Sequence, residues 1–143
     1  MRYTLVLAII TLIAGCSTAP EALLFENSRV FEKSRDDVWQ NLTSFFESSS
    51  IPVKSKDKEK GTLLAVRKLK RASIYANCGT SDLASVENGT LTVKISVHSL
   101  GALKTRATID VKFFAYRQYV GVAKSRIECF SNGTLEEEIL KNL

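Results

Sequence analysis

The chain has 143 residues, of which 45% are hydrophobic, and its 20 basic and 15 acidic side chains give a formal net charge of +5. This length accommodates one domain and excludes a two-domain enzyme or a polytopic membrane protein. One histidine and three cysteines argue against a metal site with several ligands, and we expect neither a metal nor a cofactor.

The first fifteen residues have the pattern of a signal peptide. Arg2 supplies a positive charge, and an uncharged, mostly apolar run of about 13 residues follows it. Such a run suits a signal peptide and is shorter than the roughly 20 residues of a membrane-spanning helix. It ends at residues 12–16 in Leu-Ile-Ala-Gly-Cys, which resembles the lipobox of bacterial lipoproteins. The resemblance implies a lipid anchor, with diacylglycerol and palmitate on Cys16; the alternative is an ordinary signal peptide with a chance cysteine.

The residue after the lipobox cysteine bears on localisation. Ser17 stands there instead of Asp, which resembles lipoproteins destined for the outer membrane, facing the periplasm. In a Gram-positive cell the same signal would place the protein on the outer face of the plasma membrane. Removing residues 1–15 leaves 128 residues with a net charge of +4. We therefore divide the chain into a signal peptide (1–15), a lipidated cysteine with a tether (16–27) and one globular domain (28–143).

The domain begins with a predicted strand over residues 27–33, followed by a helix. Ser34 is a favourable N-cap, and two acids in the first turn suit the helix dipole. Apolar residues then recur at the spacing of one helical face over about 14 residues. These residues are Val38, Leu42, Phe45 and Phe46, with Trp39 beside them.

The middle of the chain alternates between extended and polar segments. Pro52 indicates the start of a strand or a sheet edge, because proline cannot donate a ladder hydrogen bond. Residues 54–61 predict a charged turn, residues 62–70 a strand, and residues 71–88 a long connection.

The clearest pattern is a hairpin of two strands, residues 91–98 and 106–113. Apolar and polar residues alternate strictly in both, which predicts antiparallel strands with one dry face and one solvated face. A weaker strand is expected near residues 125–130. The last helix is predicted from a capping box, Thr134 with Glu137, and its acids at 136–138 are explained by the helix dipole. Together the elements predict an α+β, two-layer, helix-grip-like domain, with a curved antiparallel sheet and two helices packed on one face.

Two cysteines remain once Cys16 carries lipid. Export to an oxidising compartment favours a disulfide between Cys78 and Cys129. Two buried free thiols and a nucleophilic cysteine paired with His98, the one histidine, are the alternatives. His98 itself lies on the polar face of its predicted strand, where a lone histidine is usually only solvated.

Several short segments resemble known lipoproteins. Residues 30–39, 51–53 and 61–63 resemble the helix-grip domains of BamC-like outer-membrane lipoproteins. Residues 75–79 and 129–136 resemble the Tyr-x-x-Cys-Gly and Cys-x-Ser-x-Gly-x-Leu-Glu segments of small envelope lipoproteins. The chain has one such helix-grip unit where BamC has two. The resemblance implies a non-enzymatic scaffold or accessory protein.

Basic residues are concentrated in residues 54–71. With Asp57 and Glu59 counted, this segment has a net charge of +6, more than that of the whole mature chain. Its basic residues are Lys54, Lys56, Lys58, Lys60, Arg67, Lys68, Lys70 and Arg71. This cluster is a candidate contact for an acidic partner, for anionic lipid or for lipopolysaccharide. The simpler interpretation, which we favour, is a solvated sheet edge whose lysines block aggregation.

The sequence contains no phosphate-binding loop, zinc-ligand spacing, nucleophile elbow or catalytic triad, so we expect no catalytic residues and no enzyme activity. Export makes nucleic acid an unsuitable partner. We expect a membrane-anchored scaffold or accessory subunit that binds another envelope protein through the basic cluster or the wet sheet face, including Thr92, Lys94, Arg106 and Lys112. The alternative is a small-ligand or lipid-binding module with an apolar pocket between the sheet and a helix.

Overall fold

The computed structural model describes residues 24–70, 74–79 and 84–143. The predicted signal peptide, the lipidation candidate Cys16, most of the predicted tether and Arg71 lie outside the described residues. The elements in chain order are β1 (Ser28–Phe31), α1 (Arg35–Ser48), β2 (Val53–Asp57), β3 (Thr62–Leu69), β4 (Ala76–Asn77), β5 (Ala84–Gly101), β6 (Lys104–Tyr119), β7 (Ser125–Ser131) and α2 (Thr134–Asn142).

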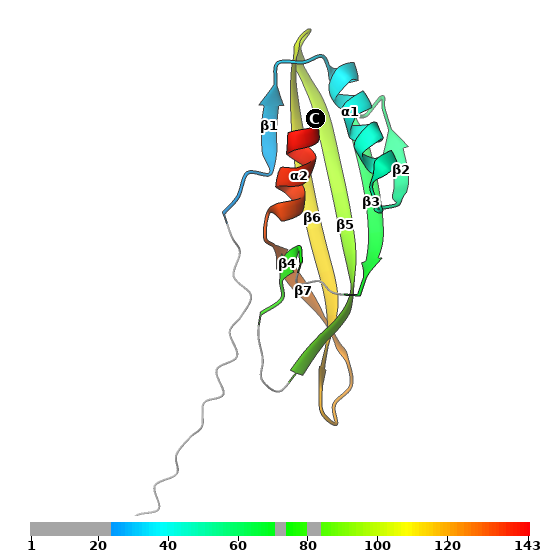
Figure 1. The fold of residues 1–143 in the computed structure, drawn as a ribbon, viewed down its shortest axis with the longest axis vertical. Coiled ribbons are helices and arrows are strands. Elements are labelled where there is room, and N and C mark those ends of the chain that lie inside the picture. The colour runs from blue at the N-terminus through cyan, green and yellow to red at the C-terminus, as the bar shows by residue number, and fades with distance from the viewer. Residues whose placement is uncertain (1–23, 71–73, 80–83) are drawn as a thin grey trace, which may run out of the picture.

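The strands form one antiparallel sheet in the order β2-β3-β5-β6-β7-β4. β1 also pairs with β6, and it joins the first part of that strand while β7 joins the second part. Both helices lie on the same face of the sheet (Figure 1). The described residues therefore have the α+β architecture expected from the sequence, with helices on one face of an antiparallel sheet.

The central hairpin is longer than the sequence pattern predicts. Pairing between β5 and β6 extends from the turn at Gly101 and Lys104 to Ala84 and Tyr119, so residues 84–88 belong to a strand and not to a connection. The sequence pattern ends before the strands do, because the alternation of aliphatic residues is interrupted. Gly89 follows a bulge in β5, and Arg117 occupies an inward position on β6. Residue types with no apolar periodicity cannot reveal a strand.

The core lies between the helices and the inward face of the sheet. Each helix contributes one buried stripe, as its apolar spacing predicts. The sheet contributes the alternate residues of β3, β5 and β6. The most completely buried of these side chains are Val38, Leu42, Leu63, Leu91, Val93, Ile95, Ile109, Phe113, Leu135 and Ile139.

The predicted charged turn of residues 54–61 is partly wrong, because its first half is the edge strand β2. The turn proper is held by Arg35 of α1, whose Nη2 donates to the carbonyl oxygens of Lys58 and Glu59. Gly61 has a φ of +66°, and a Cβ there would lie 2.2 Å from the carbonyl oxygen of Val97. Only glycine fits this close approach of two backbones.

The start of α2 also differs from the prediction. Thr134 is the first helical residue, and its N-cap is Gly133 with a φ of +83°, so the capping box between Thr134 and Glu137 does not form. The side chain of Asn132 accepts the Thr134 N–H instead, at 3.1 Å. Phe25 occupies the space where a Cβ of Gly133 would lie, so the end of the tether does dock on the domain.

Candidate functional site

The face of the sheet that points away from both helices is the candidate functional surface, and we call it the outer face. Cross-strand register assigns its members, since directly paired residues point to the same side. Thr92 pairs with Lys112, and Lys94 pairs with Asp110. The remaining described members on β3, β5, β6 and β7 are Thr62, Leu64, Val66, Lys68, Thr90, Ser96, His98, Arg106, Thr108, Phe114, Tyr116, Arg126, Glu128 and Phe130.

The outer face has more positive than negative charge. Its exposed basic side chains are Lys68, Lys94, Arg106, Lys112 and Arg126, while the acidic side chains among its described residues are Asp57 on β2, Asp110 and Glu128. The four polar candidates Thr92, Lys94, Arg106 and Lys112 do lie together on this face, as the hairpin alternation indicates.

Aromatic side chains gather at the end of the outer face where β6 and β7 pair. Phe114 pairs with Glu128 and Tyr116 pairs with Arg126. The guanidinium of Arg126 lies 3.9 Å from the centre of the Phe114 ring, a cation–π contact. Tyr116 is half-exposed. This end of the face therefore offers apolar area and positive charge side by side.

The seven basic residues of the predicted cluster that the structure describes do not form one surface. Arg67 pairs with the buried Leu91, so it lies on the helix side, where its Nη1 donates to Ser50 Oγ at 2.7 Å. The next residue, Lys68, lies on the outer face. Consecutive strand residues point to opposite faces, which divides the charge between them.

Two other lysines of the cluster are neutralised by nearby acids. Lys58 Nζ lies 2.9 Å from Asp36 Oδ1 on α1, and Lys60 Nζ lies 3.4 Å from Asp57 Oδ2 in the same turn. Lys58 and the hydrogen bond that it donates hold the pKa of Asp36 below its ordinary value. These exposed ion pairs add little stability but reduce the net charge of the hairpin.

The remaining lysines of the cluster, Lys54, Lys56 and Lys70, are solvent-exposed. Lys54 and Lys56 belong to β2, the edge strand, which is bulged between Val53 and Ser55. Charged, bulged edges are a common protection against edge-to-edge pairing. The geometry thus agrees with the simpler interpretation of this segment, a solvated sheet edge.

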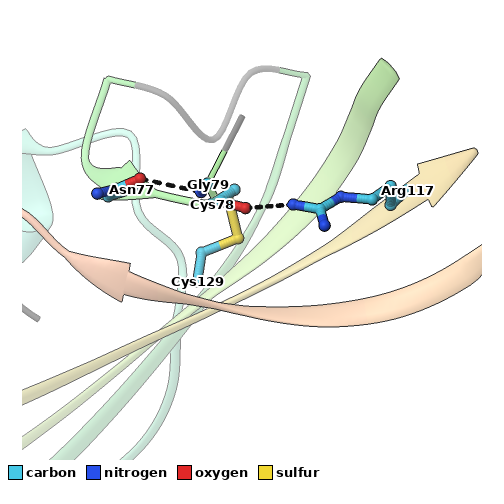
Figure 2. The surroundings of a disulfide bond; sticks show 5 residues. All are labelled: Asn77, Cys78, Gly79, Arg117 and Cys129. Carbon is cyan, nitrogen blue, oxygen red and sulfur yellow. Dashed lines mark hydrogen bonds between the residues drawn. A yellow bond between two sulfur atoms is a disulfide. The ribbon is translucent and has the colours of Figure 1, made fainter. Parts of the chain in front are cut away.

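Cys78 and Cys129 form a disulfide, which joins the segment after β4 to β7 (Figure 2). Their Cα atoms are 4.3 Å apart. Arg117 Nη2 donates to the carbonyl oxygen of Cys78 at 2.6 Å, and the N–H of Gly79 donates to Asn77 Oδ1 at 2.9 Å. The disulfide and Arg117 together fix this segment against the inward face of the long hairpin.

The alternative of a cysteine–histidine pair is not realised. Cys129 pairs with the inward-facing Phe113, whereas His98 pairs with Arg106 on the outer face, seven positions away along β6. His98 is exposed, as its place in the sequence pattern indicates.

Glu136 is a buried acid that the sequence interpretation missed. Its side chain is 1% exposed, whereas first-turn acids that interact only with the helix dipole are expected to face solvent. Ser131 Oγ donates to Glu136 Oε2 at 2.8 Å and accepts the Gly133 N–H at 3.2 Å. Burial raises the pKa of Glu136, the Ser131 hydrogen bond opposes this shift, and the charge of Asp110 adds to it. The spacing to Ile139 and Leu140, three and four residues later, is the signal that predicts this burial.

The described residues line an open pocket of about 520 Å³. It lies beside the end of β3 and is lined by Arg67, Lys68, Leu69, Lys70, Ile74 and Tyr75. The ligand-binding alternative places its cavity under α1, but Trp39 and Phe46 are buried there in the continuous core. The observed pocket is therefore at a different place from the expected one.

Within residues 24–70, 74–79 and 84–143, no three His, Cys, Asp or Glu side chains are grouped as a metal site. No helix in the same ranges is both long and apolar enough to cross a bilayer.

Comparisons with protein-family models, with curated proteins and with solved structures find no match to the chain. The assignment of a function therefore depends on the residues and the geometry.

Proposed function

We propose that this chain is a lipid-anchored, non-enzymatic envelope lipoprotein, held by Cys16 in the outer membrane and facing the periplasm. In this proposal it acts as a scaffold or accessory subunit that binds another envelope protein. Its domain is a BamC-like helix-grip unit, in which a long helix packs across a curved antiparallel sheet. The observation that supports binding is the outer face, which no helix of the described residues covers.

The dimensions of the outer face suit a protein partner. β6 has 16 residues and spans about 50 Å, and the five strands that lie side by side at the level of Thr108, β2, β3, β5, β6 and β1, have a width of about 24 Å. A standard interface buries about 800 Å² on each partner, roughly a square 28 Å wide. The arginine, tyrosine and phenylalanine side chains on this face are also types enriched at interfaces.

The charge of the outer face favours an acidic partner. Lys94 and Lys112 are exposed on neighbouring central strands and flank Asp110. Complementary charge at a solvated surface accelerates association and selects the partner, more than it adds to affinity. We therefore expect a partner whose contact surface carries an excess of Asp and Glu.

Charge reversal on two surfaces tests this proposal. Lipidated protein is purified by affinity from envelopes as the wild type, as Lys94→Glu with Lys112→Glu, and as Lys54→Glu with Lys56→Glu. The two double variants change the net charge equally, but only the first alters the outer face. We expect the first variant to lose the co-purifying partner and the second to retain it. Loss from the second variant alone would identify the β2 edge as the contact surface, and retention by both would contradict the proposal.

The anchor is tested separately by metabolic labelling with palmitate. We expect the wild type to incorporate label and a Cys16→Ala chain to incorporate none. Labelling of the Cys16→Ala chain would contradict the anchor.

A further inference from the structure

The turn between β6 and β7 is an exposed apolar tip. Residues 118–123 carry no charge, and Val120 in this turn is 97% exposed. Val122 is 58% exposed and Tyr116 precedes the tip with a half-exposed ring. Arg126 follows the tip on β7 and is exposed. Val120 therefore buries almost none of its surface within the described domain, and Val122 buries less than half.

This order of residues matches the layers of a bilayer surface. Valines suit the boundary of the acyl chains, tyrosine rings suit the interface, and basic side chains suit anionic headgroups. Peptide-binding grooves typically take up an added strand, an amphipathic helix or a polyproline segment, whereas Val120 and Val122 lie in a turn.

The direction from which the chain enters β1 favours a lipid anchor at the same end of the sheet as the β6–β7 tip. β1 runs antiparallel to β6, from Ser28 opposite Thr108 to Phe31 opposite Thr105. Followed backwards, the chain continues past Asn27, whose carbonyl oxygen accepts the Ile109 N–H at 2.8 Å. It therefore leaves the sheet towards the end at which β6 and β7 turn (Figure 1).

The length of the tether permits contact between this tip and the membrane. From Ile109, beside Asn27, to Tyr119 at the end of β6 is about 33 Å along the strand. The chain from Cys16 to Asn27 spans at most about 40 Å. A lipid on Cys16 and the apolar tip can therefore reach the same surface at once.

We propose that the β6–β7 tip inserts Val120 and Val122 into the surface of the bilayer that holds the lipid anchor, as a second membrane contact. This inference rests on the proposed anchor at Cys16. One insertion beside one anchor point would orient the long sheet relative to the membrane and present the outer face to a partner. The opposite turn also exposes apolar residues, Leu100 and Leu103, but the chain leaves β1 in the other direction.

Tryptophan fluorescence in vesicles tests the insertion. The lipidated chain is reconstituted in phosphatidylglycerol and phosphatidylethanolamine vesicles with brominated acyl chains, as Val120→Trp and, for the control, as Leu103→Trp. Leu103 is 70% exposed at the opposite turn, and the native Trp39 is buried in both variants. We expect the tryptophan emission of Val120→Trp to shift to shorter wavelength and to be quenched by the brominated acyl chains. We expect neither change in the emission of Leu103→Trp.

The mass of the chain, which shows whether it carries lipid, and its flotation with vesicles distinguish a failure of the insertion from a failure of the anchor. A chain that carries lipid and floats with the vesicles, but shows no quenching of Val120→Trp, overturns the insertion alone. Quenching of Leu103→Trp, alone or together with Val120→Trp, overturns the assignment to this tip. A chain that carries no lipid and does not float overturns the anchor and the insertion together.

Discussion

The disulfide between Cys78 and Cys129 should supply a large part of the stability of the domain. It closes a loop with a sequence separation of 51 residues. In the chain-entropy description, such a loop restricts the unfolded chain enough to stabilise the fold by about 4 kcal/mol. Because small domains have a total of only about 5–15 kcal/mol, the Cys78→Ala, Cys129→Ala chain should be markedly less stable.

Urea denaturation measures this loss directly. We expect the free energy of unfolding to fall by about 4 kcal/mol in the double variant, and the reduced wild type to give the same value as the variant. If the reduced wild type and the double variant lose the same free energy of unfolding, the loss comes from the bond and not from the packing of the sulfur atoms. A loss below about 1 kcal/mol in both would refute the entropic reasoning, and would show that the unfolded chain is already restricted near these residues.

Two further predictions concern the backbone and a buried acid. Gly61→Ala should destabilise the fold by clearly more than Gly121→Ala, because both have positive φ but only Gly61 faces the Val97 carbonyl; equal losses in urea denaturation would contradict the close approach. Because the folded pKa of Glu136 is raised, its contribution is complete at acidic pH and is lost as pH rises through that pKa. As pH rises above the ordinary range of a glutamate, Glu136→Gln should therefore gain stability relative to the wild type, since its amide stays neutral and its oxygen still accepts from Ser131. Parallel pH profiles of the free energy of unfolding for the two chains would contradict this prediction.

The parts of the fold that the sequence predicts well are those with strong local signals. Ser34 caps α1 as expected, accepting the Asp37 N–H at 3.2 Å, and the helix buries the predicted stripe. The strands over residues 91–98 and 106–113 pair in the expected antiparallel direction, with their apolar residues inward. The apolar residues recur with a period of 3.6 in the helix and of 2 in the strands. In both they fall on the buried face, so the sequence pattern and the packing agree.

Most of the parts that were missed have no local signal of their own; Glu136, whose spacing to Ile139 and Leu140 indicates burial, is the exception. The far halves of β5 and β6 pair through backbone hydrogen bonds at positions where Gly89 and Arg117 interrupt the apolar alternation. The inward, part-buried position of Arg117 depends on its hydrogen bond to the carbonyl oxygen of Cys78, which is distant in sequence. Glu136 is buried because Ser131, five residues away, supplies its hydrogen bond. Such tertiary compensation overrides the usual preference of charged residues for solvent.

The candidate surface was only partly predictable. Alternation placed Lys94 and Lys112 on the solvated face correctly. The cluster of residues 54–71 is continuous in sequence but is divided in space, because Arg67 and Lys68 point to opposite faces and Lys58 is paired with Asp36. A charge count along the chain cannot detect either effect, since both depend on strand pleat and on a neighbouring helix.

Site-specific photo-crosslinking in intact envelopes tests the central claim most directly. A photoreactive residue is placed at Thr92 on the outer face and, in a separate chain, at Gln40 on the exposed side of α1. The proposed function predicts one discrete adduct with another envelope protein from Thr92 and none from Gln40. An adduct from Gln40 with none from Thr92 would show that the partner binds the helical layer, and would contradict the assignment of the outer face.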